Sequence, residues 1–211
     1  MDVILSRDGV DALECDLLVT GMFQDERPIK GTSGWIDWRL NGRLSRLVMD
    51  KRLTGDWKET TLIPSSGRIT PRMILLLGLG RTKEYSTIRL RELFAHVLET
   101  IKNLRTSSIC LSLPFGGERY RVDPGKLTEV FLEGIVDGLD RWKHTPDEDW
   151  IKTLRLFFAG GGNHVSEILL GVQAAESLLR DRLTIRVLIP SEEPGGSLIS
   201  GSRSQPFGSA A

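Results

Sequence analysis

Three apolar runs, each followed by a glycine-bearing turn and then by an amphipathic helical pattern, constrain the possible folds of this chain more than any other feature. The runs cover residues 73–79 before Gly80, residues 108–113 before Pro114-Phe115-Gly116-Gly117, and residues 154–158 before Gly160-Gly161-Gly162. Strands that alternate with helices are typical of an α/β layer protein, and such folds bind ligands at the sheet edge where the strands deliver their loops. We therefore expect an α/β protein whose candidate sites lie in these loops.

Other segments of the chain continue this alternation of strands and helices. Apolar runs at residues 3–5, 17–22, 60–63 and 184–189 predict further strands. Apolar residues at helical spacing predict four helices, over residues 32–48, 86–101, 123–139 and 163–179. Thr32 or Ser33 is expected to cap the first helix, and Asn163 the last. Asp123 followed by Pro124 is a strong helix start.

The alternation of strands and helices continues to about residue 190 without an obvious linker. This continuity favours a single domain over residues 1–190. Residues 191–211 are rich in Ser, Gly and Pro and contain few apolar side chains. We predict that they form a flexible tail.

The charge of the chain is balanced overall, with 28 basic and 28 acidic residues, so no global field favours nucleic acid or a membrane. Residues 39–105 nevertheless hold 14 Lys and Arg against 6 Asp and Glu. Most such local excesses are solvated helix faces, and DNA binding through this region is kept as a weaker alternative. The candidate residues are Arg39, Arg43, Arg46, Lys51 and Arg52.

The sequence also bears on the compartment. No apolar stretch approaches the roughly 20 residues of a membrane-spanning helix, and the first residues lack the features of a signal peptide. Cys15 and Cys110 have neither the spacing of a redox pair nor that of a zinc site, so two buried, reduced thiols are expected. We expect a soluble, cytoplasmic protein without membrane contact.

Five segments carry a resemblance to a known family through their order and spacing. They are residues 16–19 (Asp-Leu-Leu-Val), 44–47 (Leu-Ser-Arg-Leu), 59–64 (Glu-Thr-Thr-Leu-Ile-Pro), 74–80 (Ile-Leu-Leu-Leu-Gly-Leu-Gly) and 133–143 (Glu-Gly-Ile-Val-Asp-Gly-Leu-Asp-Arg-Trp-Lys). Together they resemble the N-terminal domain of the leucyl aminopeptidase family, peptidase family M17, over roughly residues 10–180. The resemblance implies a macro-domain-like fold, a three-layer α/β/α arrangement with a mixed sheet flanked by helices.

The resemblance also implies where catalysis would reside. In that family a separate C-terminal domain binds two metal ions through a lysine and several carboxylates, and carries an Asn-Thr-Asp-Ala-Glu-Gly-Arg signature. These 211 residues contain no such string, and two-metal hydrolysis needs carboxylates that bridge the ions. We therefore expect no catalytic residues, no metal site and no cofactor.

Two glycine loops and one aspartate are the candidate ligand-binding residues. Glycines before a helix N-terminus let the backbone approach an anion, although a simple capped turn explains the same pattern. The region around residues 107–126 is similar to the diphosphate loop of macro domains, in which Asp8 would take the place of the aspartate that contacts adenine. The Asn-Ala-Asn run of ADP-ribose binders is absent. The candidates are Asp8, Gly116, Gly117, Gly160, Gly161, Gly162 and Asn163.

The five tryptophans are considered as candidates for an association surface, and the three histidines as candidates for a metal site. Trp35 and Trp38 share one face of a helix turn and form either an association surface or the edge of the core. The histidines form no visible metal set. His144 precedes an acidic segment, residues 146–149, which we interpret as a solvated turn carrying helix-capping acids rather than as a cation site.

Two hypotheses from different classes follow. The first is a non-catalytic, free-standing homologue of the aminopeptidase N-terminal domain that acts in oligomer assembly or in binding a protein partner. The alternative is a macro-like binder, or hydrolase, of ADP-ribose or another nucleotide.

Overall fold

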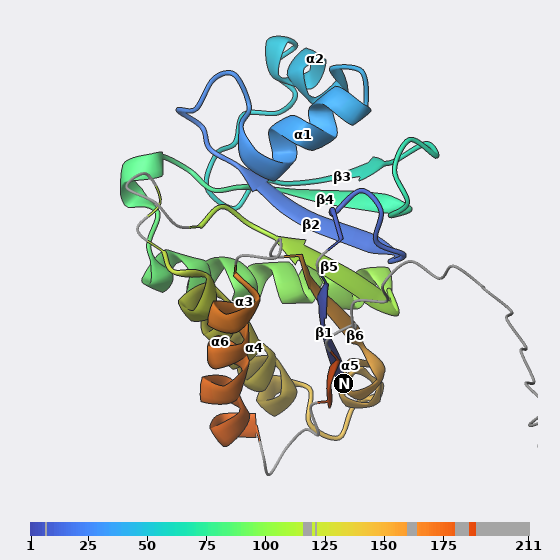
Figure 1. The fold of residues 1–211 in the computed structure, drawn as a ribbon, viewed down its shortest axis with the longest axis vertical. Coiled ribbons are helices and arrows are strands. Elements are labelled where there is room, and N and C mark those ends of the chain that lie inside the picture. Colours follow the sequence, from blue (N-terminus) through green and yellow to red (C-terminus); the bar gives the residue numbers. More distant parts are fainter. Residues whose placement is uncertain (7, 116–119, 121, 160–163, 180–185, 189–211) are drawn as a thin grey trace, which may run out of the picture.

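The computed structural model describes residues 1–6, 8–115, 120, 122–159, 164–179 and 186–188. The strands of this part of the chain form one mixed sheet of seven, in the order β3-β4-β2-β5-β6-β1-β7 (Figure 1). Only the β3–β4 pair is antiparallel among them. The strands are β1 (Asp2–Ser6), β2 (Leu17–Met22), β3 (Thr60–Pro64), β4 (Met73–Gly78), β5 (Ser108–Ser112), β6 (Arg155–Ala159) and β7 (Arg186–Leu188).

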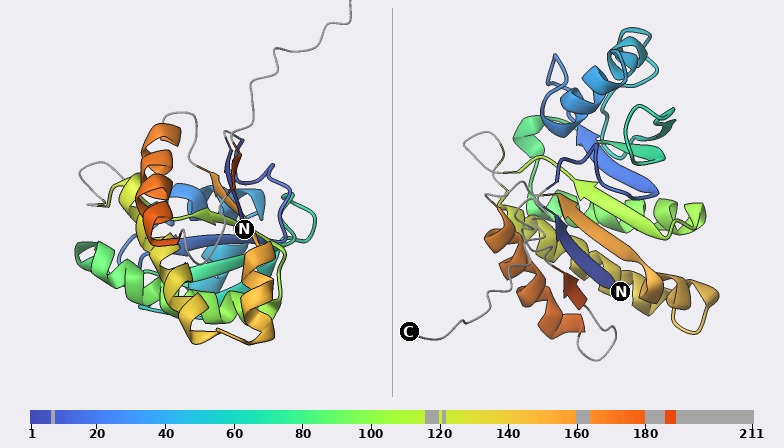
Figure 2. Two further views of the ribbon diagram at one scale, coloured as in Figure 1. Left: turned by 90° about the horizontal axis from the view of Figure 1, so that it is seen from below. Right: turned by 45° about the vertical axis from the view of Figure 1, so that its right-hand side comes forward.

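Helices cover both faces of this sheet. On one face lie α1 (Gly31–Arg39) and α2 (Arg43–Met49), and on the other lie α3 (Thr87–Leu104), α4 (Pro124–Arg141), α5 (Pro146–Thr153) and α6 (Val165–Leu179) (Figures 1 and 2). A short 3₁₀ turn, η1 (Thr82–Glu84), precedes α3. The expected three-layer α/β/α fold with a mixed sheet is therefore confirmed.

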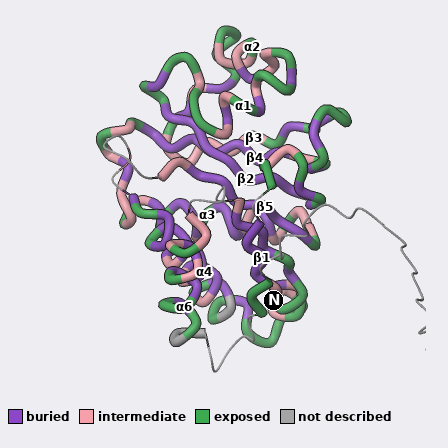
Figure 3. The backbone as a smooth tube through the Cα atoms, in the orientation of Figure 1, coloured by how far each residue is buried: buried purple, intermediate pink, exposed green. Residues whose placement is uncertain are grey.

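Strand β4 shows why the central strands are apolar throughout. Ile74 and Leu76 pack into the core beneath α1 and α2, whereas Leu75 and Leu77 pack into the core beneath α3 and α4. Because both faces are covered, neither set of side chains meets water. Burial accordingly runs along the middle of the sheet, as Figure 3 shows.

The two long helices on the lower face in Figure 1, α3 and α4, begin and pack as their sequences predict. Ser86 and Asp123 are their N-cap residues, and each side chain accepts a hydrogen bond from the backbone three residues later. Their inward faces meet at Phe94 and Phe131, whose rings lie edge to face at 4.8 Å between centroids.

The helix predicted over residues 32–48 is wrong as a single element. The chain forms α1 and α2, separated where Asn41 and Gly42 adopt positive φ values of 56° and 71°. Neither Thr32 nor Ser33 caps α1, because the N-cap is Lys30 and it makes no side-chain cap hydrogen bond. The apolar spacing misled us because both helices bury apolar residues in the same core.

The acidic segment at residues 146–149 is not a turn. It opens α5, with Asp147, Glu148 and Asp149 in the first turn, where carboxylates offset the positive end of the helix dipole. His144 donates its backbone N–H to Glu148 at 2.8 Å.

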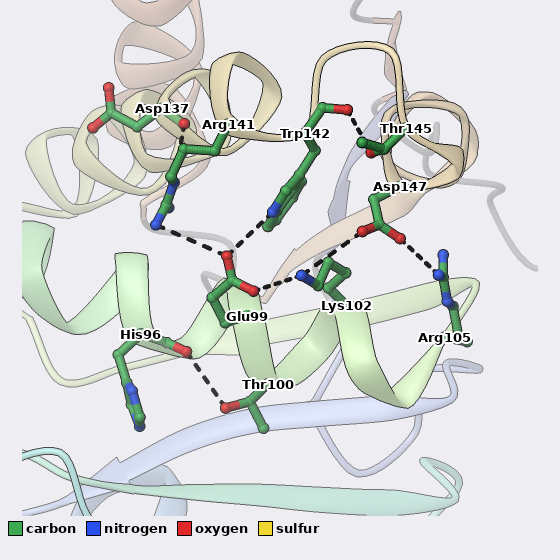
Figure 4. A network of polar contacts seen from close by, with 10 residues as sticks. All are labelled: His96, Glu99, Thr100, Lys102, Arg105, Asp137, Arg141, Trp142, Thr145 and Asp147. Carbon is green, nitrogen blue, oxygen red and sulfur yellow. Dashed lines mark hydrogen bonds and ion pairs between the residues drawn. The ribbon is translucent and has the colours of Figure 1, made fainter.

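A polar network fixes α5 against α3 (Figure 4). Trp142 Nε1 donates to Glu99 at 3.1 Å, and Lys102 Nζ lies 2.6 Å from the same carboxylate. Hydrogen bonding from Lys102 is the largest of the effects that lower the pKa of Glu99. Asp147 in turn lies 2.6 Å from the Arg105 guanidinium. The junction between α4 and α5 is thus tied to the last turns of α3.

At the opposite edge of the sheet from the strand carboxyl ends, Asp16 joins β2 to β5. Its Oδ2 accepts hydrogen bonds from the backbone N–H of Ser107 and of Ser108, both at 3.0 Å. It also accepts from the hydroxyls of the same two serines, at 2.6 and 3.0 Å. One carboxylate thereby orders the start of β5.

Some predictions fall outside the described residues, namely the cap at Asn163 and the tail at residues 191–211. The helices among the residues that the structure does describe include none with the length and apolarity to span a membrane.

Candidate functional site

A cleft of about 390 Å³ opens at the carboxyl ends of β1, β5 and β6. Its walls come from the loop after β1, the first turn of α1, the segment after β5 and the residue before α6. This is the edge at which open α/β sheets bind ligands. The side chains with polar or aromatic groups in its lining are Asp8, Thr32, Ser112, Phe115, Tyr120 and His164.

Two hydroxyls meet in this lining. Thr32 Oγ1 and Ser112 Oγ are 2.8 Å apart, which links α1 to the last residue of β5. Ser33 attaches helix α1 to strand β2. Its hydroxyl donates a hydrogen bond to the carbonyl of Gly21 at 2.6 Å and lies 3.1 Å from Thr20 Oγ1. Because Thr20 and Gly21 belong to β2, the helix begins directly at the end of the sheet.

Asp8 places a carboxylate on the cleft. Ser6 Oγ donates to Asp8 Oδ2 at 3.1 Å and accepts the Asp8 N–H at the same distance, which holds the loop beside the end of β1. The side chain is otherwise exposed. A carboxylate accepts hydrogen bonds and repels anions, so this part of the cleft suits an amine or a hydroxyl of a ligand.

Aromatic rings supply the apolar part of the lining. Phe115 lies edge to face with the His164 ring at 5.1 Å between centroids, and His164 Nδ1 is 2.8 Å from Glu167 Oε2. Tyr120 stacks on Phe23 at 5.4 Å. Ring faces of this kind accommodate a flat ligand group such as a base.

Tyr85 holds the segment after β5 in place. Its hydroxyl donates a hydrogen bond to the carbonyl of Pro114 at 2.8 Å. Burial raises the pKa of Tyr85 far above its ordinary range, so the phenol stays protonated and remains a donor. This contact fixes the backbone immediately before Phe115 and hence the position of its ring.

The structure places one of the predicted ligand residues, Asp8, on the cleft. Gly116, Gly117, Gly160, Gly161, Gly162 and Asn163 lie outside the described residues. Residues that flank both glycine loops do line the cleft, namely Pro114 and Phe115 before one, and Ala159 and His164 around the other. Ligand binding by these residues remains a prediction.

Sequence reasoning missed Thr32 and Ser112 as members of this lining. Ser112 ends a predicted strand, and the rule that strand carboxyl ends gather at one edge could have selected it. Thr32 carries no comparable signal, since its position depends on where α1 sits on β2.

The basic residues proposed for DNA binding are spread over α1, α2 and the turn that follows. Arg39 lies 3.1 Å from Asp11, Arg43 donates to the carbonyl of Pro64, and Arg46 donates to the carbonyl of Asn41. Lys51 and Arg52 are exposed after α2. DNA binding through these five residues stays a prediction, and three of the guanidiniums already have intramolecular contacts.

Four of the five tryptophans form two groups, and the fifth, Trp57, is partly buried against the core. Trp142 is buried, and Trp150 donates its Nε1–H to the carbonyl of Thr106 at 2.8 Å. Both side chains pack at the edge of the core. Trp35 and Trp38 are 46% and 65% exposed on α1, with their rings stacked at 5.0 Å between centroids. The structure thus places one pair of large aromatic side chains in solvent.

Arg39 completes this exposed surface. Its guanidinium lies 5.9 Å from the Trp35 ring centroid and 6.0 Å from that of Trp38, within cation–π range. The stack and the ion pair with Asp11 hold the two rings in a defined arrangement. We call Trp35, Trp38 and Arg39 the α1 aromatic surface.

The histidines are dispersed. His96 Nε2 lies 3.3 Å from Thr60 Oγ1 on the outside of α3, His144 is exposed, and His164 borders the cleft. Among the residues that the structure describes, no group of three or more His, Cys, Asp or Glu side chains could hold a metal ion.

Comparison with known proteins identifies relatives of this chain. Residues 19–144 match the family model described as "Cytosol aminopeptidase family, N-terminal domain". The chain is 29% identical over 173 residues to a probable cytosol aminopeptidase of Trichormus variabilis, covering 78% of this chain and 34% of that protein. It is 23% identical over 196 residues to one from Alkaliphilus metalliredigens, covering 90% and 38%. The chain thus spans about a third of the length of these relatives.

Solved structures share the fold. A tomato leucine aminopeptidase variant superimposes with a TM-score of 0.59 at 17% identity, covering 85% of this chain and 37% of that one. The Oceanobacillus iheyensis macrodomain with MES bound gives a TM-score of 0.59 at 12% identity, covering 84% and 92%. The fold of the described chain is therefore macrodomain-like.

Proposed function

Because this chain belongs to the cytosol aminopeptidase family through its N-terminal domain, we propose that it is a non-catalytic module of that family that acts by association, first of all with a second copy of itself. The α1 aromatic surface carries this proposal. Exposed tryptophans are costly to hydrate and concentrate binding energy when an interface covers them. The family match over residues 19–144 is to the N-terminal domain, and the proposal of a role without catalysis concerns that domain.

The arrangement of the surface favours an interface. Stacking and the Arg39 guanidinium already restrict the rotamers of both rings, so little side-chain entropy remains to be lost on association. Trp and Arg are also the residue types that dominate interface hot spots.

Replacing Trp35 and Trp38 with serine should weaken self-association. A tryptophan hot spot contributes about 2 kcal/mol or more, which corresponds to at least roughly a 30-fold weaker Kd for each ring. Light scattering coupled to size exclusion over a concentration series measures the effect. Far-UV circular dichroism should be unchanged, because neither side chain belongs to the core.

Ile88→Ser is the matched control, since Ile88 is 75% exposed but lies on α3, on the other face of the sheet. It should leave the assembly intact. A wild type that stays monomeric at all concentrations would contradict self-association. Release of p-nitroaniline from leucine p-nitroanilide with added Mn²⁺ or Zn²⁺ would contradict the non-catalytic half of the proposal.

The cleft supports a second candidate function, binding of ADP-ribose or a related nucleotide. Its lining combines hydroxyls, a carboxylate and aromatic faces at the edge where α/β sheets hold ligands. We choose ADP-ribose among flat polar ligands because the sequence around residues 107–126 is similar to the diphosphate loop of macro domains.

ADP-ribose should raise the melting temperature if the cleft holds it. Ligand at 100 times its Kd stabilises the folded state by about 2.7 kcal/mol, which is roughly 5–10 °C for a chain of this size. Differential scanning fluorimetry with ADP-ribose, ADP and ribose measures the shift. Asp8→Ala and Thr32→Val should reduce it, whereas Asp50→Ala, exposed after α2, should not. The absence of a shift across the panel would remove this candidate.

A further inference from the structure

A second hollow lies on the face of the sheet opposite the α1 aromatic surface. It is a groove of about 310 Å³ between the first turns of α4 and the first half of α6. Among the described residues, none lines both this groove and the candidate ligand cleft, so the two are separate sites. The residues that matter here are Asp123, Lys126 and Glu129 at the start of α4, and Glu167, Leu170 and Ala174 on α6.

The α6 side of this groove is apolar and open to solvent. Leu170 is 65% exposed, and Ala174, one turn later on the same helix face, is exposed as well. Exposed apolar surface with a polar rim is typical of an interaction site, and an aliphatic side chain packs well against an aromatic ring. The groove therefore suits a partner that carries exposed aromatic side chains.

The polar rim of the groove is acidic. Its described residues include three carboxylates, those of Asp123, Glu129 and Glu167, and one ammonium group, that of Lys126. Lys126 Nζ lies 2.7 Å from Glu129 Oε1 and compensates a single negative charge. The surrounding helices reinforce the field, because α4, α5 and α6 together carry nine Asp and Glu against three Lys and Arg. A partner that binds this face should therefore be basic.

The layer that carries the α1 aromatic surface has the opposite charge. Residues 31–52, which form α1, α2 and the turn after them, hold five Lys and Arg against two Asp. Arg43 and Arg46 donate to backbone carbonyls, and a neutral carbonyl leaves the charge of a guanidinium uncompensated. Exposed tryptophans and basic side chains thus occupy the same two helices.

We infer that the α1 aromatic surface of one copy docks into the α4–α6 groove of a second copy. The inference rests on the proposed self-association and names the surface that receives the aromatic side chains. In this contact the tryptophan rings pack on Leu170 and Ala174, while Arg43 and Arg46 face the carboxylates of the groove. Apolar surface meets apolar surface, and positive charge meets negative charge.

The two surfaces lie on opposite faces of the sheet within one chain. Helices α1 and α2 are at the top of the molecule in Figure 1, and α4 and α6 lie below the sheet. A contact that joins two different surfaces is heterologous, and it leaves one surface of each kind open when two copies have met. The assembly should therefore grow head to tail beyond a dimer, or close into a ring.

A groove variant tests the docking site. Leu170→Ser together with Glu129→Lys removes the exposed apolar contact and reverses one carboxylate, so the Kd of self-association should rise at least about tenfold, equivalent to about 1.4 kcal/mol. Light scattering over a concentration series measures it. Ile88→Ser together with Glu92→Lys is the matched control, since it makes the same two changes at exposed positions of α3, and it should leave the Kd within about twofold. If circular dichroism shows the double groove variant to be unfolded, Leu170→Ser alone provides the test.

A mixture of two disabled variants identifies which surfaces meet. The chain with Trp35→Ser and Trp38→Ser keeps its groove, and the groove variant keeps its α1 aromatic surface. At a concentration at which each is monomeric alone, an equimolar mixture should form dimers with one copy of each. These dimers should not grow, because both of their outward surfaces are disabled. Native mass spectrometry with one variant isotopically labelled gives the composition.

Three results would overturn the inference and leave the proposed self-association standing. A groove variant that assembles like the wild type would place the contact elsewhere, for example between two α1 aromatic surfaces. An equal loss in the α3 control would mean that the groove is not the docking site. A mixture that stays monomeric would show that the two surfaces do not meet. A wild type that is monomeric at all concentrations would instead contradict the proposed function, on which the inference rests.

Discussion

A Gly171→Ala variant should lose about 3 kcal/mol of folding free energy, because the added methyl group has no space. A Cβ at residue 171 would lie 2.1 Å from the carbonyl oxygen of Gly125, and no flexible side chain is available to move aside. Helices α6 and α4 approach each other backbone to backbone at this point, so they would have to separate. The melting temperature should fall by roughly 6–12 °C for a domain of this size.

Gly134→Ala is the control for this prediction. It lies on α4 and gains the same helix propensity of about 1 kcal/mol, but its new Cβ would meet Phe94 Cβ at 3.4 Å and Leu98 Cδ1 at 3.5 Å, which are ordinary contacts. Its stability should be equal to or above that of the wild type. A Gly171→Ala variant that is as stable as Gly134→Ala in urea titrations would show that the α4–α6 crossing tolerates separation.

An Asp16→Ala variant should lose about 3 kcal/mol at neutral pH. Hydrogen bonds to a charged acceptor contribute about 1.5–3 kcal/mol, and the variant would also leave donors of Ser107 and the buried Ser108 without their acceptor. Urea unfolding monitored by tryptophan fluorescence gives the difference. Glu14→Ala removes an exposed carboxylate two residues earlier and should change stability by less than about 0.5 kcal/mol.

The same contact predicts an acid dependence. Hydrogen bonding from Ser107 is the largest of the effects that hold the pKa of Asp16 below its ordinary value. A carboxyl group whose pKa is lower in the folded state stabilises the fold above its unfolded pKa of about 3.9 and loses this contribution as the pH falls through the folded value. The stability gap between wild type and Asp16→Ala should therefore narrow on acidification below about pH 4. A gap that is constant down to strong acid would contradict the role of the charged form.

Much of the fold could be predicted because the signals for its strands and helix starts lie within short segments of the sequence. The buried strands read as continuous apolar runs, and Ser86 and Asp123 were recognisable as helix caps. Two parts of the secondary structure were predicted wrongly, the break between α1 and α2 and the helix α5. Asn41-Gly42 is a turn signal that interrupts the apolar spacing, and it was overlooked because residues on both sides of it pack into one core. At α5, Thr145-Pro146 and the acids that follow form a helix start, but few apolar residues accompany them.

The cleft was only partly predictable, and the reason is distance along the chain. Asp8 came from a family resemblance, whereas the contact between Thr32 and Ser112 joins residues whose approach depends on the neighbouring places of β2 and β5. Strand order is a property of the whole sheet, and no local pattern reveals it.

The position of β1 has a consequence for synthesis on the ribosome. Strand β1 pairs with β6 on one side and with β7 on the other. Asp2 therefore cannot pair before Arg155 and Arg186 have been synthesised. At translation rates of 5–20 residues per second, the first strand remains unpaired for roughly 8–30 s while the later strands are made. The nascent chain therefore exposes an apolar strand with open edges until β6 has been made, and the pairing of β1 with β7 comes last among the strands of this sheet.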